Sequence, residues 1–142
     1  MTAVSLVTLG VADLSRASAF YERLGWRRSS SSVDGVVAFF HGGTAALGLF
    51  GWDDLAEDAH LPADRPEGFR GISLAMNVAS ERAVDDALRL AEEAGGTISK
   101  PGERAEWGGY SGYFRDPDDH LWEVAHNPGW ALRPDGGVSL PD

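Results

Sequence analysis

The feature that most constrains this chain is a strand-then-helix pattern that occurs twice. An apolar run over residues 4–11 is followed by Asp13, a good helix N-cap, and by a helical apolar stripe over 14–24. The same order returns with an apolar run over residues 71–78 and Ser80 as the N-cap. The two caps lie 80 − 13 = 67 residues apart. The spacing predicts a duplicated architecture.

Short strand-like segments follow each predicted helix, and in the first half Asp34-Gly35 and Gly42-Gly43 separate them as hairpin turns. They cover residues 26–33, 36–41 and 44–50 in the first half and residues 97–100, 110–115 and 120–125 in the second. This order predicts an α+β fold. We expect one domain over residues 1–130, with a first module at about 4–51, a linker at 52–70 that begins with a short acidic helix, a second module at about 71–126, and a C-terminal extension at 131–142.

The opening strand of each half alternates between two kinds of residue. One face carries large apolar residues and is suited to packing under a helix. The other face is small or weakly polar: Leu6, Thr8 and Gly10 in the first half, and Ser73, Ala75 and Asn77 in the second. Two interpretations stay open for this second face, a ligand cavity or a sheet surface exposed to solvent.

Charge and composition restrict the partners of the chain. Its 142 residues carry a formal net charge of −10, which disfavours binding to nucleic acid. A cationic ligand would be attracted, although acidity also simply favours solubility. The sequence has no cysteine, no apolar run long enough to cross a membrane and no leader-like N-terminus. We therefore expect a cytoplasmic protein that binds neither membrane nor nucleic acid.

Two stretches of sequence resemble the signatures of a known superfamily. The first half contains Leu-Gly-Val-Ala-Asp-Leu at 9–14 and Ala-Phe-Tyr-Glu-Arg-Leu-Gly-Trp at 19–26. The second half ends with Gly-Tyr-Phe-Arg-Asp-Pro-Asp-Asp-His-Leu-Trp-Glu-Val at 112–124, preceded by Trp107-Gly108. Together they resemble the vicinal oxygen chelate superfamily, which includes glyoxalase I, bleomycin resistance proteins and extradiol dioxygenases. The resemblance implies two βαβββ modules whose mixed sheets curl around a cleft, and a homodimer.

The resemblance also implies four positions at which metal-dependent members carry ligands. In this chain they fall on Leu6 or its immediate neighbour, near Leu47 or Gly48, on Ser73 (or its neighbour Ile72), and on Glu123. Only Glu123 can bind a divalent ion, whereas tight sites need about three protein ligands. We therefore expect no metal and no other cofactor. The four histidines, His41, His60, His120 and His126, are interpreted as surface or structural residues.

Glu123 leaves three interpretations open. It is a general base, a contact for a cationic or hydrogen-bonding ligand group, or a structural carboxylate. Aromatic residues in irregular segments and on the following strand suggest a stacking surface for an aromatic or cationic ligand, although they equally suit a dimer interface or a cover for the cleft edge. The complete predicted ligand-binding set is Thr8, Trp52, Ser73, Asn77, Trp107, Tyr110, Tyr113 and Glu123.

The sequence therefore favours a protein that binds a small molecule, as bleomycin resistance proteins do, without the usual divalent metal. The alternative is a glyoxalase-like lyase, isomerase or dioxygenase that uses Glu123 as its catalytic residue. Fold alone does not decide between them, because one scaffold supports many functions.

Overall fold

The computed structural model describes residues 2–142, and the chain divides into two compact units between Arg70 and Gly71. The first unit contains β1 (Leu6–Val11), α1 (Leu14–Arg23), β2 (Arg27–Arg28), β3 (Val37–His41), β4 (Ala46–Gly51) and α2 (Trp52–Asp58). The second contains β5 (Leu74–Asn77), α3 (Glu81–Glu93), β6 (Thr97–Arg104), β7 (Tyr110–Arg115), β8 (Leu121–His126), β9 (Ala131–Leu132) and β10 (Val138–Ser139).

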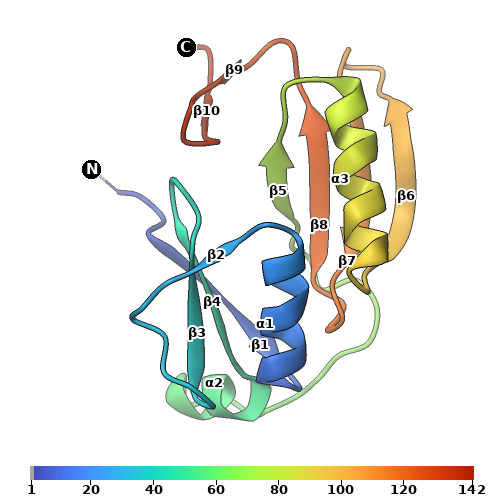
Figure 1. Cartoon of the computed structure of the whole chain (residues 1–142). Helices are drawn as coiled ribbons and strands as arrows, with labels where there is room; N and C mark the ends of the chain where they lie inside the picture. The colour runs from blue at the N-terminus through green and yellow to red at the C-terminus, as the bar shows by residue number, and fades with distance from the viewer. Residues whose placement is uncertain (1) are drawn as a thin grey trace. The chain divides into compact units, whose positions relative to one another are not determined.

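Each unit is built around a mixed sheet of four strands with the same topology. The strand order is β1-β4-β3-β2 in the first unit and β5-β8-β7-β6 in the second. β1 pairs with β4, and β5 with β8, in parallel, and the remaining pairs in both sheets are antiparallel. These two βαβββ-like sheets confirm the predicted α+β fold and its duplication (Figure 1).

Both predicted helix N-caps are confirmed. The Asp13 carboxylate accepts a hydrogen bond of 3.0 Å from the backbone N–H of Arg16, and the Ser80 hydroxyl accepts one of 3.0 Å from that of Ala83. Each bond satisfies one of the free N–H groups at the helix start. The 67-residue offset seen in the sequence is therefore the offset between two capped helices that begin the same way.

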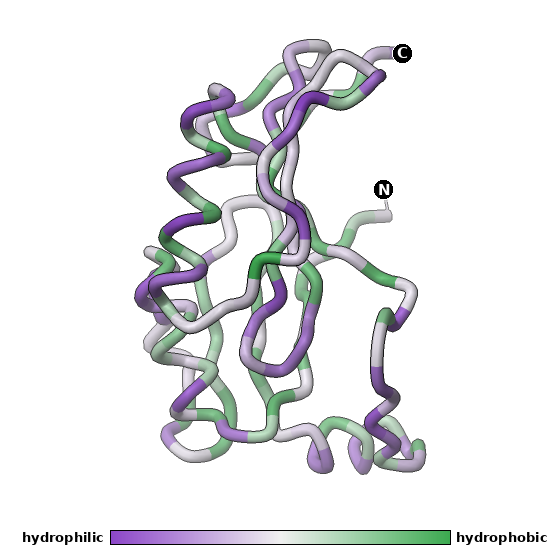
Figure 2. The backbone as a smooth tube through the Cα atoms, turned by 90° about the vertical axis from the view of Figure 1, so that its right-hand side faces the viewer, coloured by the Kyte–Doolittle hydropathy of each residue, from purple (hydrophilic) through white to green (hydrophobic). Residues whose placement is uncertain are grey.

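In the first unit, α1 covers one face of its sheet with buried aromatic residues. Phe20 and Tyr21 form an edge-to-face pair with ring centroids 5.1 Å apart, and the Tyr21 ring lies 6.3 Å from that of Phe40 on β3. These three side chains are at most 1% exposed. Along both long helices, hydrophobic and hydrophilic residues alternate with each turn (Figure 2).

In the second unit, α3 lies across β6, β7 and β8 (Figure 1). It buries Val84, Leu88 and Ala91. Under it, Trp122 of β8 stacks on Phe114 of β7 with ring planes only 5° apart. Trp122 is 4% exposed and belongs to the core of this unit.

Three strand predictions differ most from the structure in length. The strand predicted over 26–33 is reduced to β2 because Ser29 starts a turn, in which its hydroxyl accepts from the Ser31 N–H and its carbonyl from the Ser32 N–H. The strand predicted over 71–78 begins only at Leu74, since Gly71 has a left-handed φ of 78°. The strand predicted over 97–100 continues to Arg104 through a bulge.

Candidate functional site

The open face of the second sheet is defined by what packs against the opposite face. A Cβ added to Gly112 on β7 would contact the side chain of Leu88, so Gly112 points toward α3. Residues next to it along the strand point the other way. Tyr113 therefore lies on the face turned away from the helix, together with Glu123, its register partner on β8.

A row of four side chains crosses this open face, one from each strand. In register order they are Ala75, Glu123, Tyr113 and Lys100. The Tyr113 hydroxyl donates a hydrogen bond of 3.0 Å to Oε2 of Glu123. The Lys100 ammonium lies 5.8 Å from the centroid of the Tyr113 ring, within cation–π distance. Glu123 and Tyr113, both predicted site residues, thus form one half-buried pair.

This pair keeps the phenol protonated. Burial raises the pKa of Tyr113 most, and the hydrogen bond to Glu123 and its negative charge raise it further. A phenol is already protonated at neutral pH with its ordinary pKa of about 10, so the raised pKa keeps Tyr113 a hydrogen-bond donor further into the alkaline range. Within residues 2–142, the second oxygen of Glu123, Oε1, receives no hydrogen bond, and it offers an acceptor to a molecule on this face.

The other predicted residues of the second unit do not all share this face. Ser73 is exposed just before β5, and Asn77 is half-buried at its end, opposite Ala125. Tyr110 points toward α3 instead, where its hydroxyl donates a 2.8 Å hydrogen bond to Asp85 that raises its pKa. Trp107 is 55% exposed in the turn between β6 and β7, and its ring covers Gly109 at a place where a Cβ would collide.

The two predicted residues of the first unit lie in different surroundings. Thr8 shares an open sheet face with Gly48, because a Cβ added to Gly48 would lie 3.2 Å from the Thr8 hydroxyl. Trp52 begins α2 and donates its indole N–H to the Asp64 carbonyl at 3.0 Å. The guanidinium groups of Arg65 and Arg70 lie 5.7 and 5.0 Å from the Trp52 ring. Trp52 therefore organises the 52–70 segment, and its ligand contact stays a prediction.

Comparison with known proteins assigns the family. The sequence profile of the Glyoxalase/Bleomycin resistance protein/Dioxygenase superfamily matches residues 3–124. The chain belongs to this superfamily. A search of curated proteins found no match to the chain.

Solved structures of this superfamily share the fold. A glyoxalase-related enzyme from Fulvimarina pelagi is 31% identical over the whole of both chains, with a TM-score of 0.90. A lactoylglutathione lyase from Agrobacterium tumefaciens is 26% identical over 89% of this chain and 95% of its own, with a TM-score of 0.68. A superfamily enzyme from Burkholderia phytofirmans PsJN, 21% identical over 86% of this chain and 96% of its own, has a TM-score of 0.78 and shows the fold alone.

The residues of this superfamily member do not fit the metal that metal-dependent relatives carry. Of the two candidates on β4, Leu47 pairs in register with the buried Phe40, whereas a Cβ added to Gly48 would lie next to Thr8, Leu6 and Phe39. The open-face position is therefore Gly48, and the other position of the first unit is Leu6. The two positions of the second unit are Ser73 and Glu123. Across residues 2–142, the structure brings together no three His, Cys, Asp or Glu side chains able to hold a metal ion. Of these four positions, Glu123 is the one whose side chain could bind a divalent ion.

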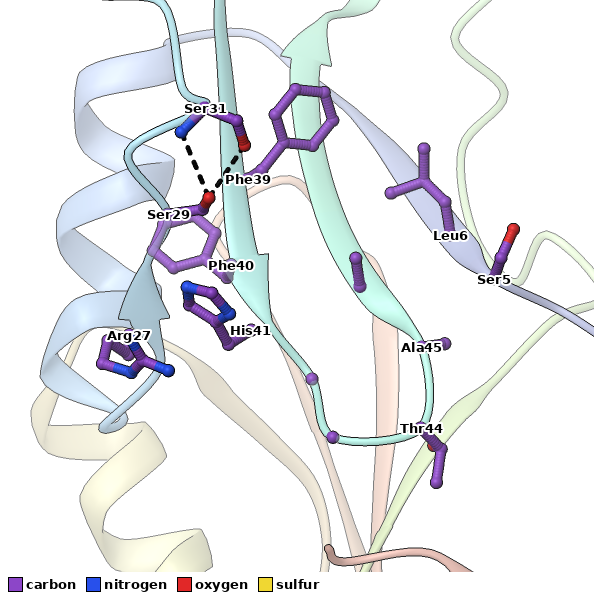
Figure 3. A pocket seen from close by; sticks show the side chains of 13 residues that line it. Ser5, Leu6, Arg27, Ser29, Ser31, Phe39, Phe40, His41, Thr44 and Ala45 are labelled. Carbon is purple, nitrogen blue, oxygen red and sulfur yellow. Dashed lines mark hydrogen bonds between the residues drawn. The ribbon is translucent and has the colours of Figure 1, made fainter.

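One feature of the first unit was not predicted from its sequence. An open pocket of about 780 Å³ lies at the end of β3 and β4, and its lining includes Arg27, Ser29, Phe39 and His41 (Figure 3). The signal in the sequence was weak, because His41 and Arg27 are separated by a turn and two short strands.

None of the described helices is both long and apolar enough to cross a membrane.

Proposed function

We propose that this superfamily member binds a small organic molecule on the open face of its second sheet, with no divalent metal in the site. The observation that carries the proposal is the Tyr113–Glu123 pair, in which a protonated phenol and a carboxylate meet at 3.0 Å on a half-buried sheet face. The Tyr113 hydroxyl donates to Oε2 of Glu123, the other carboxylate oxygen is available to a ligand, and the Tyr113 ring lies beside them. Such convergent polar groups on an apolar support are typical of ligand sites.

The chemistry of the pair favours a ligand with a cationic or hydrogen-bond donating group next to a flat apolar part. The Glu123 carboxylate attracts the donor or cation, and the Tyr113 ring supports the flat part. Ala75 leaves space beside Glu123, because it occupies the neighbouring register position with the smallest chiral side chain. The net negative charge of the chain also attracts a cationic ligand.

The experiment uses benzylamine, an aromatic cation, and benzyl alcohol, its uncharged analogue, followed by amide NMR shifts of β7 and β8. We expect saturable shifts with benzylamine, weakened about tenfold or more in Tyr113→Ala and in Glu123→Gln, from the loss of the cation–π contact and of the charged hydrogen bond respectively. Tyr110→Ala, on the opposite face of β7, is the matched control and should bind normally. Equal loss in Tyr110→Ala and Tyr113→Ala, or no saturable shift, would overturn the proposal.

A second candidate is a glyoxalase-like lyase or isomerase in which Glu123 is the general base. It is favoured by the Fulvimarina pelagi protein, which is described as a glyoxalase-related enzyme and is 31% identical. In this reading Tyr113 holds the carboxylate in place. Glu123→Gln would abolish turnover, whereas Tyr113→Phe would reduce it less. Turnover that survives Glu123→Gln unchanged would exclude this candidate.

A further inference from the structure

The pocket of the first unit lies beside the turn that joins β3 to β4. All of its lining belongs to the first unit: Ser5, Leu6, Arg27, Ser29, Ser31, Phe39, Phe40, His41, Gly42, Gly43, Thr44, Ala45 and Ala46. Figure 3 shows Arg27 and His41 next to each other at one end, with Phe39 between them and Leu6. The pocket thus combines a basic end with an apolar one.

Its charge is opposite to that of the chain. The lining contains no aspartate or glutamate, although the chain carries a net charge of −10. Arg27 and His41 face each other as register partners on β2 and β3. The adjacent Arg28 is paired with Asp34 at 3.1 Å, whereas no acidic side chain of residues 2–142 forms an ion pair with Arg27. A basic group without a counterion beside a cavity is suited to an anionic ligand.

Polar groups next to the basic end are already ordered. The hydroxyls of Ser29 and Ser31 lie 2.8 Å apart and are hydrogen-bonded, and the Ser31 N–H donates to the Ser29 hydroxyl at 3.2 Å. On the other side the chain turns tightly at Gly42, where a Cβ would collide with the Ala45 carbonyl. Gly43 follows with φ of 76°, a conformation that favours glycine. One edge of the pocket therefore carries a hydrogen-bonded serine pair, and the other a turn whose backbone requires glycine.

We propose that this pocket binds a small ligand through an oxyanion, a carboxylate or a phosphate, held by Arg27 and His41, with the apolar part of the ligand against Phe39 and Leu6. Arg27 provides a charged fork that matches either oxyanion, and the hydrogen-bonded pair of Ser29 and Ser31 leaves one hydroxyl free to donate. The inference goes beyond the function proposed above. It concerns the other unit, the opposite ligand charge, and no residue of the Tyr113–Glu123 pair.

The test measures binding of benzoate, phenyl phosphate and the uncharged benzamide to the full chain by amide NMR shifts of residues 29–31 and 42–45. We expect saturable shifts with at least one anion and none with benzamide. The tighter of the two anions then identifies carboxylate or phosphate as the preferred group. Equal shifts with benzamide, or no saturable shift with either anion, would overturn the proposal.

Two neighbouring arginines supply the variant and its matched control. Arg27→Ala should weaken anion binding about tenfold or more, as expected for a lost charged hydrogen bond, with Arg27→Gln as a second variant that keeps the side-chain volume. Arg28→Ala removes the same charge one residue away and should bind as the unmodified chain does. Equal weakening in Arg27→Ala and Arg28→Ala would show a general charge effect and refute the pocket. Glu123→Gln should leave benzoate binding unchanged, so the two proposals fail independently.

Discussion

Two tyrosines on one strand illustrate how strongly a single residue depends on its face. Tyr110 and Tyr113 are three residues apart, so period-two alternation places them on opposite faces of β7. Tyr110 donates to Asp85 of α3, and Tyr113 donates to Glu123 of β8. The strand itself was predicted from the sequence, but neither acceptor was, because each partner lies far away along the chain. Glu123 becomes the partner of Tyr113 through strand register, and Asp85 becomes the partner of Tyr110 through the packing of α3 on the sheet. A local sequence pattern provides neither.

The two phenols should titrate separately. Burial and Glu123 raise the pKa of Tyr113 above the ordinary value of about 10, and Asp85 raises that of Tyr110. Glu123→Gln should lower the pKa of Tyr113 only in part, since burial remains, and should leave Tyr110 unchanged. Asp85→Asn should lower the pKa of Tyr110 and leave that of Tyr113 unchanged. Ultraviolet absorbance of tyrosinate against pH measures both, and a Tyr113 that ionises at the ordinary value would contradict the structure.

The raised pKa values of the two tyrosines also make the stability of the fold depend on pH. A raised pKa means that the folded chain keeps a proton that the unfolded chain loses. The stabilisation is complete below a pH of about 10, the unfolded value, and is lost as the pH rises through the folded value. Each phenol therefore contributes to alkaline unfolding, and neither contributes to acid unfolding.

Among the elements, helices were predicted better than strands. Both long helices begin at a cap that the sequence identifies, because the N-cap bond joins residues three apart. The second strand was predicted too long, because Ser29 and Ser31 form a turn through their hydroxyls directly after β2. Local bonds are visible in a sequence, whereas the competition between a turn and a sheet ladder is decided by packing.

The helix caps allow a direct measurement of this local contribution. Ser80→Ala removes the acceptor for the Ala83 N–H and should lower the free energy of unfolding by about 1 kcal/mol. Asp13→Ala should have a similar cost at α1. Ser15→Ala, an exposed position just inside α1, is the control and should cost nothing measurable. Urea denaturation gives all three values, and a cost for Ser15→Ala equal to that of Ser80→Ala would contradict the cap assignment.

For the whole molecule, the sequence predicted the duplication but only part of the site. The repeat is expressed by short-range signals that occur twice, and the superfamily signatures identify the same two modules. The Glu123 position followed from one of these signatures. The pocket at Arg27 and His41 did not, because it exists only when β2 pairs with β3 in its particular register. Sites assembled by long-range pairing of short strands leave little trace in a single sequence.

The assembly state is the remaining prediction at this scale, and we expect a homodimer. Large apolar side chains are exposed near the first strand of each unit, with Val4 67% and Ile72 58% exposed. The superfamily resemblance implies the homodimer, and because contiguous apolar surface marks interaction sites, these two side chains are the candidates for its contact. Light scattering at micromolar concentration should therefore give twice the mass of one chain, and Ile72→Asp should shift it toward the monomer. Leu90→Asp, at a position on α3 that is 40% exposed, is the control and should stay dimeric. A monomer in the unmodified protein would refute the expectation, because apolar exposure would then have no partner in a second copy of the chain.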